Sequence, residues 1–333
     1  MIDQVPPEFW RQLLERQQAL LQELQALRQA QSDQTAQLKA QEQRLLELRV
    51  LIDRQTGFHR AMMVSGRTAA DGRDADPLSL TRAYAQVYSQ NGEDGMTSEI
   101  FRRIGVQDRF FVEIGIENGL QCNTRLLLEA GWRGVWLEGS EKKAREARQY
   151  FRSFLESGSL KIAVSIIGPE NIETILDQMG VPARFDYLSL DIDQHTHNVW
   201  RAMKREARVA CIEYNASVPP SMAIEVPFDP TKFWDGSNWY GAGLKTLELI
   251  GAAKHMRLVG CDLVGVNAFF VTADEAEGRF RSPFTAETHY QPASYRLVAH
   301  AGHPAARDAR HWVRSPEAMP LDPFPKPSSQ GTP

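Results

Sequence analysis

The sequence has few cysteines, no long apolar run and no excess of positive charge. Its three cysteines, Cys122, Cys211 and Cys261, are too widely spaced for a zinc site or a disulfide framework. Two lie in apolar, strand-like runs, which is typical of small buried side chains in a reducing compartment. No apolar run approaches the ~18 residues of a membrane span. The N-terminus, MIDQVPPEFW, lacks the features of a secretory signal. We therefore expect a cytoplasmic protein with no membrane span.

The net charge is −4 at pH 7. Proteins that bind nucleic acids usually carry a basic face that neutralises phosphates, so we expect no nucleic-acid partner, although a local basic patch is compatible with this charge. The hydrophobic fraction of 42% is ordinary for a soluble protein with a real core.

Residues 8–54 contain neither glycine nor proline, which favours one long helix. Mostly apolar residues recur at alternating steps of three and four, the period of a left-handed coiled coil. This seam comprises Trp10, Leu13, Gln17, Leu20, Leu24, Leu27, Gln31, Gln34, Leu38, Gln41, Leu45, Leu48 and Ile52. We predict an oligomerisation segment over 1–55 that forms a homodimer or homotrimer. The alternative is a helix packed on its own domain.

Residues 56–80 are rich in Gly, Asp, Arg and Ser, which predicts a linker. Residues 81–275 then alternate short apolar runs with amphipathic segments, the pattern of an α/β domain. The predicted strands are Arg109–Ile114, Gly134–Leu137, Lys161–Ser165, Tyr187–Leu190, Val209–Ile212, Arg257–Gly260 and Ala268–Val271. The first five are separated by helices and predict a parallel sheet. A short turn at 262–266 predicts a closing antiparallel hairpin. Residues 276–333 are expected to be an extension with a disordered end.

Ligands of open parallel sheets bind beyond the carboxyl ends of the strands. After the first strand comes FVEIGIENGLQCNT, in which Gly115 and Gly119 open a turn that a ligand could approach closely, beside Glu113. A carboxylate there suits a cationic ligand better than a pyrophosphate. After the second strand, Glu138 is placed to accept the hydroxyl groups of a ribose. The alternative for Glu138 is a surface cap of the next helix. Ser165 and Ile166, after the third strand, are placed to flank an adenine or are simply a strand end.

The fourth and fifth strands end in LSLDIDQHTHNVW and CIEYNASVPP. Neighbouring parallel strands bring Asp191, Asp193, Glu213 and Asn215 to one edge, where their oxygen atoms suit Mg²⁺ or Mn²⁺. His195 is a candidate general base because its ordinary pKa, near 6.5, suits proton removal at neutral pH. Alternatively, the aspartates cap the next helix and the histidines are solvated. A zinc site is disfavoured because no further soft ligands are near.

Two other segments are candidate pocket walls. YSQNGEDG, which includes Gln90, is placed to fold over a cofactor. The loop 217–238 is longer than the ~12–15 residues of ordinary connections, which is typical of a lid or binding loop. Aromatic residues in and just after that loop would stack on a sugar or simply pack the lid down.

Seven blocks, in order, resemble the FkbM-like branch of class I methyltransferases: YSQNGEDG, FVEIGIENGLQCNT, GWRGVWLEG, DYLSLDID, CIEYNA, WYGAGLKTLELI and LVGCDLVGVNAFFV. The resemblance covers about 88–271. It implies a Rossmann-like, seven-stranded, mostly parallel sheet that binds S-adenosylmethionine. Glu113, Gly115 and Asn118 would lie along the methionine portion, Glu138 at the ribose and Asp191 near the methyl donor. Gln90, Gly119, Asn123, Gly139, Ser165 and Ile166 complete the predicted donor site.

The resemblance further implies O-methyl transfer to a hydroxyl of a sugar, a glycan or a glycosylated small molecule, assisted by Mg²⁺. Asp191, Asp193 and His195 are the predicted catalytic residues. The chain departs from the family pattern after LSLDID, where Gln194, His195 and Thr196 replace Gly-Asn-Asp. This departure fits a changed acceptor, histidine-based proton removal or lost activity.

Two other functions compete with methyl transfer. A catalytically silent scaffold would act through its coiled coil, which in either case would join copies of the domain or tether them to a polysaccharide-synthesis partner. A metal-dependent hydrolase would use Asp191, Asp193 and the two histidines, His195 and His197.

Overall fold

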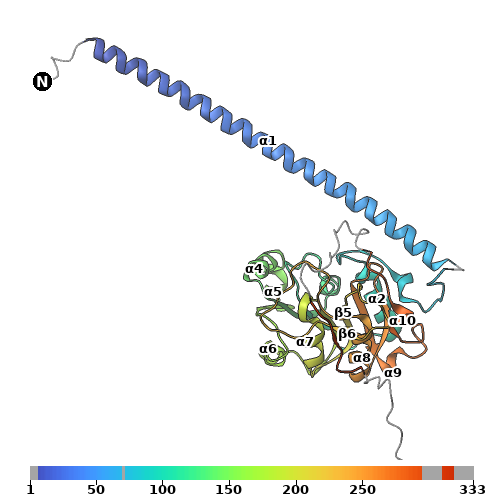
Figure 1. The fold of residues 1–333 in the computed structure, drawn as a ribbon. Coiled ribbons are helices and arrows are strands. Elements are labelled where there is room, and N and C mark those ends of the chain that lie inside the picture. Colours follow the sequence, from blue (N-terminus) through green and yellow to red (C-terminus); the bar gives the residue numbers. More distant parts are fainter. Residues whose placement is uncertain (1–6, 70–71, 295–309, 319–333) are drawn as a thin grey trace, which may run out of the picture. The chain divides into compact units, whose positions relative to one another are not determined.

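The computed structural model describes residues 7–69, 72–294 and 310–318 (Figure 1). The chain divides into two compact units, one up to Phe58 and one from His59 onward. Each unit is described by itself below. In the described residues, no helix is long and apolar enough to cross a membrane.

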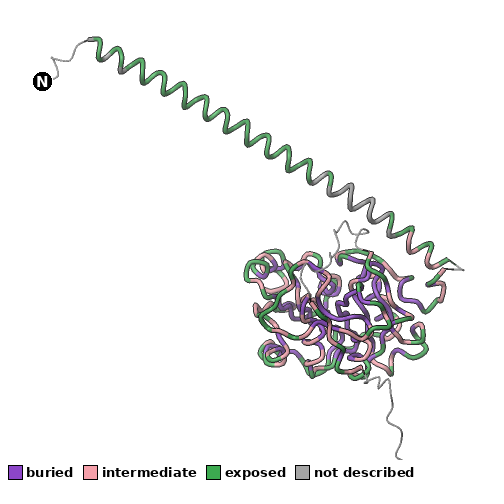
Figure 2. The backbone as a smooth tube through the Cα atoms, in the orientation of Figure 1, coloured by how far each residue is buried: buried purple, intermediate pink, exposed green. Residues whose placement is uncertain are grey.

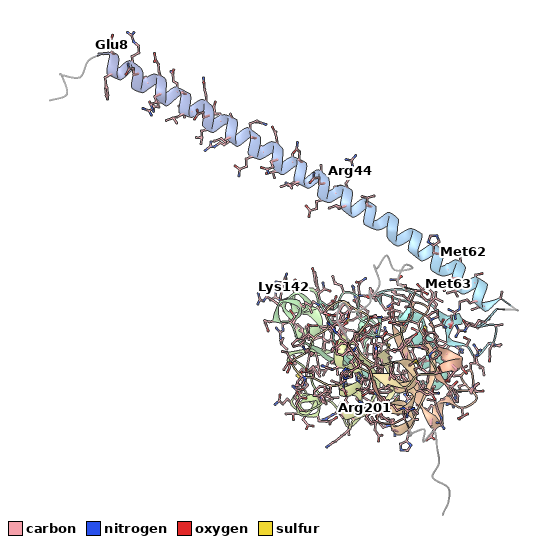
Figure 3. All side chains as sticks on the ribbon, viewed as in Figure 1. Glu8, Arg44, Met62, Met63, Lys142 and Arg201 are labelled. Atoms are coloured by element: carbon pink, nitrogen blue, oxygen red, sulfur yellow. The ribbon has the colours of Figure 1, made fainter. Side chains whose placement is uncertain are left out.

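The first unit is formed by the long helix α1 (Pro7–Thr68), whose last turns belong to the second unit. Figures 2 and 3 show α1 exposed over most of its described length, with side chains such as Glu8 and Arg44 projecting from it. The leucines of the predicted seam that the structure describes are 47–68% exposed: Leu20, Leu24, Leu27, Leu38, Leu45 and Leu48. Within the first unit, these leucines form an apolar seam that no other segment of that unit covers.

The second unit is built around a seven-stranded sheet with the order β3-β2-β1-β4-β5-β8-β7. Its strands are β1 (Phe110–Ile114), β2 (Arg133–Glu138), β3 (Leu160–Val164), β4 (Arg184–Leu190), β5 (Glu206–Glu213), β7 (Met256–Cys261) and β8 (Asn267–Thr272). The first five pair in parallel, and β8 pairs antiparallel with both β5 and β7. This confirms the predicted Rossmann-like, mostly parallel sheet with a closing hairpin.

Helices connect the strands or flank the sheet. They are η1 (Leu80–Ala83), α2 (Glu93–Ile104), α3 (Arg125–Glu129), α4 (Glu141–Tyr150), α5 (Arg152–Glu156), α6 (Ile172–Gln178), η2 (Asp193–His195), α7 (Thr196–Ala202), α8 (Leu244–Ala253), α9 (Ala273–Ala276) and α10 (Ala286–His289). A second, two-stranded sheet pairs β6 (Ile224–Glu225) with β9 (Val313–Arg314).

Two apolar layers cover the faces of the main sheet, because successive side chains of a strand point to opposite faces. Val112 and Ile114 belong to a layer completed by side chains of α6, α7 and α8. Phe111 and Trp136 belong to the other, completed by α2, α3 and α4. Strands buried on both faces explain the nearly continuous apolar runs in the sequence.

The predicted boundaries differ from the structure at both ends of the α/β domain. The expected linker 56–80 is wrong in its first half, because α1 continues to Thr68. Isolated glycines cost only ~1 kcal/mol each in a helix, and the surrounding residues are helix formers. Leu80 is part of the core, as are Ala276, Phe280 and Ala286 beyond the expected end at 275. The expected disordered end, 320–333, lies outside the described residues.

Candidate functional site

The order of the parallel strands reverses between β1 and β4, the point at which open α/β sheets bind ligands. The turns that follow these strands touch there. Asp191 N–H donates to the Ile114 carbonyl at 3.0 Å. Gly115 has φ +89°, and a Cβ atom at this position would lie 1.6 Å from the Asp191 carbonyl oxygen. The freedom of Gly115 is therefore used to admit the β4 turn, whereas the sequence had suggested the approach of a ligand.

Three carboxylates converge at this reversal point. Asp191 and Asp193 follow β4, Glu213 ends β5, and one oxygen from each lies within 4.8 Å of the others. The Thr196 hydroxyl donates to Glu213 at 3.2 Å. Asp193 has φ +58°, a conformation rare outside glycine that costs an L-residue of order 1 kcal/mol. We call these three side chains the carboxylate triad.

Burial raises the pKa of all three triad carboxyl groups, and their mutual repulsion raises it further for Asp193 and Glu213. The pKa of Asp191 rises to about 6 through desolvation, although a hydrogen bond with Glu213 opposes the rise. The pKa of Asp193 rises to about 7 through desolvation and the charge of Asp191. Desolvation and the charges of Asp191 and Asp193 raise the pKa of Glu213 well above its ordinary value. A bound cation, or protons held near neutral pH, would stabilise such a cluster of carboxylates.

Asn215, the fourth predicted metal ligand, has a different role. Its amide donates to the carbonyls of Asn238 and Tyr240, both at 2.8 Å. Its oxygen accepts from the backbone and hydroxyl of Ser217 at 2.9 and 2.5 Å. These bonds use both donors and both acceptor positions of the amide. Asn215 fixes the start and end of the 217–238 loop and has no lone pair left for a metal.

Glu113 is bound by the turn that follows β1, and its predicted contact with a methionine portion stays a prediction. It is 4% exposed and accepts from Asn123 N–H at 2.9 Å, Thr124 N–H at 3.0 Å and the Thr124 hydroxyl at 2.5 Å. Desolvation raises its pKa despite these bonds. Asn123 is likewise turned inward and donates to the Ser189 hydroxyl. Gly119 has φ +80° and packs against Trp136, so it also serves the fold.

Glu138 ends β2 and joins it to the turn after β1. Its Oε2 accepts from Glu117 N–H and its Oε1 from Ser140 N–H, both at 2.8 Å. Each oxygen keeps a second lone pair, and the side chain retains 8% exposure. Beside it, Lys143 pairs with Glu117 at 2.8 Å. A Cβ at Gly139 would meet only the Ser165 carbonyl, at 3.8 Å. The end of β2 is thus an acidic, uncrowded position.

The other predicted donor-site residues lie around this edge. Ile166 is 65% exposed after β3, and Ser165 beside it is partly exposed. Asn118 accepts from Leu120 N–H within the turn after β1. Gln90 lies opposite Gln121, at 3.4 Å, and is exposed. These positions leave the adenine prediction open and do not test it.

The two histidines turn away from the triad, and among the described residues neither completes a metal-ligand group with it. The Nε2 of His195 lies 2.8 Å from the Asp229 carbonyl, and its ring centre lies 5.0 Å from that of Phe228. Burial lowers the pKa of His195. His197 is fully buried between Asn198 and Glu225, and its pKa falls to about 3 through burial. His195 therefore anchors the 217–238 loop, and His197 is a neutral core residue.

Sequence reasoning missed Lys143, Glu117 and Asp229 as members of this site. Lys143 had a sequence signal, because it lies in the first turn of the helix that follows Glu138. Asp229 had none, because its backbone carbonyl, rather than its side chain, makes the contact with His195.

No family model and no curated protein matches this chain. Among solved structures, it is similar to the N-terminal domain of EvdMO1 with SAH bound, at 12% identity and TM-score 0.36, over 57% of this chain and 82% of that one. It is also similar to magnesium protoporphyrin IX methyltransferase from Synechocystis, at 13% identity and TM-score 0.37, over 65% and 91%. A third similar structure is an O-methyltransferase from Bacillus cereus, at 19% identity and TM-score 0.37, over 60% and 84%. Similarity at this level does not bear on the activity of the chain.

Proposed function

We propose that this chain is a class I, S-adenosylmethionine-dependent O-methyltransferase of the FkbM-like branch. The observation that carries the proposal is the pair of acidic edges on either side of β1: Glu138 at the end of β2 and the carboxylate triad beyond β4 and β5. A ligand with a ribose at one end and a positive charge at the other fits this arrangement better than an anionic nucleotide does.

The residues present fit such a donor in three respects. Glu138 keeps lone pairs for two ribose hydroxyls, since its backbone contacts use only one per oxygen. The exposed Ile166 and the open space at Gly139 suit a flat base next to the ribose. Asp191 and Asp193 of the triad are partly exposed and have raised pKa values, so a sulfonium or ammonium beside them would favour their charged forms and be stabilised by them. When bound, S-adenosylmethionine supplies an electrophilic methyl group.

The proton of the acceptor hydroxyl needs a base, and the geometry favours Asp193 over His195. The pKa of Asp193, about 7, suits a general base near neutral pH, and its side chain is partly exposed. His195 holds the loop through Asp229, and its Nδ1 is buried. In a second arrangement, Asp191, Asp193 and Glu213 hold Mg²⁺ or Mn²⁺, which would bind the acceptor oxygen. Loss of activity in EDTA would favour the second arrangement.

We propose a sugar-like acceptor, on the strength of the family resemblance and of the aromatic 217–238 loop. Phe228 and Phe233 of that loop are 44% and 68% exposed, and aromatic faces of this kind stack on the apolar face of a sugar ring. The replacement of Gly-Asn-Asp by Gln194, His195 and Thr196 now has a structural meaning, because His195 contacts the loop and Thr196 contacts Glu213.

The direct test is isothermal titration of the purified chain with S-adenosylmethionine. We expect binding that weakens at least tenfold in Glu138→Gln, which corresponds to ~1.4 kcal/mol. Glu141→Gln is the matched control, because that side chain is exposed and pairs only with Arg148 among the described residues. No binding to the unaltered chain, or equal binding by all three proteins, would refute the proposal.

We further propose that α1 joins copies of the chain through its exposed leucine seam, as a dimer or trimer, and could tether them to a polysaccharide-synthesis partner. Apolar seams at 3.5-residue spacing are normally covered by a second helix. Light scattering should show an oligomer for the full chain and a monomer after deletion of 1–54. A monomeric full chain would refute this part and favour a helix packed on its own domain. We also propose a cytoplasmic location, which the three free and buried cysteines support.

The alternatives have less support. The hydrolase proposal used both histidines, and neither joins the triad. A silent scaffold predicts donor binding without methylation of any glycan, which a turnover assay with tritiated donor distinguishes.

A further inference from the structure

The C-terminal residues 310–318, which we call the strap, return to the domain and lie along the 217–238 loop. In the middle of the strap, β9 pairs with β6 of the loop, with Ile224 opposite Arg314 and Glu225 opposite Val313. Next to this pairing, Ser315 N–H donates to the Ala223 carbonyl at 2.9 Å. The strap therefore adds a strand to a loop that otherwise has no sheet partner in the described residues, apart from a single bridge between Glu225 and Ala242.

Opposite charges fix the two ends of the strap. At its start, Arg310 pairs with Asp235 of the loop at 2.8 Å and lies over the Trp239 ring at 5.0 Å. At its end, Glu317 accepts two hydrogen bonds from Arg201 of α7, at 2.5 and 3.0 Å. Since one end is positive and the other negative, a strap that ran in the opposite direction would place like charges together. The charges thus favour the observed direction of the strap.

Arg201 connects the strap to the site (Figure 3 labels it). It also donates to Glu225 of β6 at 2.7 Å, so one guanidinium holds α7, the loop and the strap. α7 begins at Thr196, directly after η2, which carries Asp193 and His195. From the other side, the loop reaches the same segment through the bond between Asp229 and His195. The strap is therefore bonded to α7 and to the 217–238 loop, the two elements that hold the segment with Asp193.

We propose that the strap is a positioning element of the reaction site: it holds the 217–238 loop and the segment with Asp193 and His195 in place, so that the acceptor side of the site is ordered by the C-terminus. This rests on the proposed function for the meaning of "acceptor side". Glu317, Arg201 and Arg310 are its positioning residues. Within 72–294 and 310–318, the strap makes no hydrogen bond or ion pair with the donor side, at Glu138 and the turn after β1, so the donor side should not depend on it.

The experiment compares two truncations of the full chain. Ending the chain after Ala309 removes the strap, whereas ending it after Ala318 keeps the strap and is the matched control. Hydrogen exchange read by mass spectrometry should show faster exchange over 226–238 and 191–197 in the first variant, by roughly tenfold or more, with exchange in β1–β5 unchanged. Affinity for S-adenosylhomocysteine should stay within about twofold.

A point variant tests the proposal if the chain that ends after Ala309 does not fold. Glu317→Gln removes one charge from the Arg201 contact, and Glu173→Gln removes one from the comparable Arg205 contact, in which no strap residue takes part. Nitrogen-15 NMR of the histidine rings should show a changed His195 signal in Glu317→Gln only. His289, buried on α10, should keep its signal in both variants. General destabilisation would not select His195 in this way.

Three results would overturn the proposal. The first is unchanged hydrogen exchange over 226–238 in the chain without the strap. The second is exchange that rises equally in the central strands. The third is an affinity for S-adenosylhomocysteine that falls tenfold or more in that variant. If the unaltered chain does not bind S-adenosylhomocysteine while the exchange result stands, the proposed methyl transfer fails but the positioning role of the strap remains.

Discussion

Replacing Asp193 by Asn should stabilise the protein, and the stabilisation should be larger at pH 8 than at pH 5. The pKa of Asp193 rises from 3.8 to about 7 on folding, because of burial and the neighbouring Asp191 charge. At 1.36 kcal/mol per pKa unit, holding this charge in the folded state costs about 4 kcal/mol. The side chain is partly exposed and solvent screens it, so we expect about half of that, ~2 kcal/mol. Asn removes the charge and tolerates the φ of +58°.

The sign follows from proton linkage. The folded state keeps the Asp193 proton at pH values where the unfolded chain has lost it, so the folded protein binds more protons between about pH 4 and pH 7. Its stability must then fall as pH rises through that window. The Asn variant lacks this loss, so the difference between the two proteins should be ~1 kcal/mol at pH 5 and should rise to ~2 kcal/mol at pH 8.

The assay is urea unfolding followed by tryptophan fluorescence, at one protein concentration and at both pH values. Asp108→Asn is the matched control, because Asp108 is exposed and lies outside the triad. A variant no more stable than the parent at pH 8, or stabilised equally at both pH values, would show that the three carboxylates do not meet in the folded protein.

Two further changes test the same edge of the sheet. Gly115→Ala should cost about 4 kcal/mol of unfolding free energy, because the new Cβ would need the Asp191 backbone to move and φ is +89°, while Gly139→Ala should stay within ~0.5 kcal/mol. A midpoint urea concentration that is the same for both variants would contradict the close contact of the two turns. Millimolar Mn²⁺ at pH 8 should raise the melting temperature by ~2–4 °C, since it offsets the repulsion in the triad. Asp193→Asn should remove most of that rise, and an equal rise in both proteins would place the ion elsewhere.

The strands and their order of connection were predictable because burial on both faces leaves a continuous apolar signal in the sequence. FFVEI, GVWLE and VACIE need no knowledge of their partners to be recognised as buried strands. The meeting of Asp191, Asp193 and Glu213 followed from the same reasoning, since parallel neighbours end at one edge. The end of α1 was not predictable in the same way. The helix continues past its predicted end because isolated glycines, such as Gly57 and Gly66, weaken a helix without ending it.

Side-chain direction was not predictable for residues whose partners lie farther along the chain. Glu113 ends a strand, as a ligand-binding carboxylate would, but the backbone of Asn123 and Thr124 turns back onto it. His195 follows two aspartates in a pattern that predicts a catalytic role, but its ring is hydrogen-bonded to a backbone carbonyl of the 217–238 loop. In both cases the sequence supplies the residue type and the tertiary contact decides its use.

A crystal structure with S-adenosylhomocysteine tests the central claim most directly. We expect the ribose hydroxyls to lie within hydrogen-bond distance of Glu138 and the homocysteine portion to extend over the turn after β1 toward Asp191. Density for the ligand elsewhere on the domain, or a Glu138 carboxylate that makes no contact with it, would contradict the account.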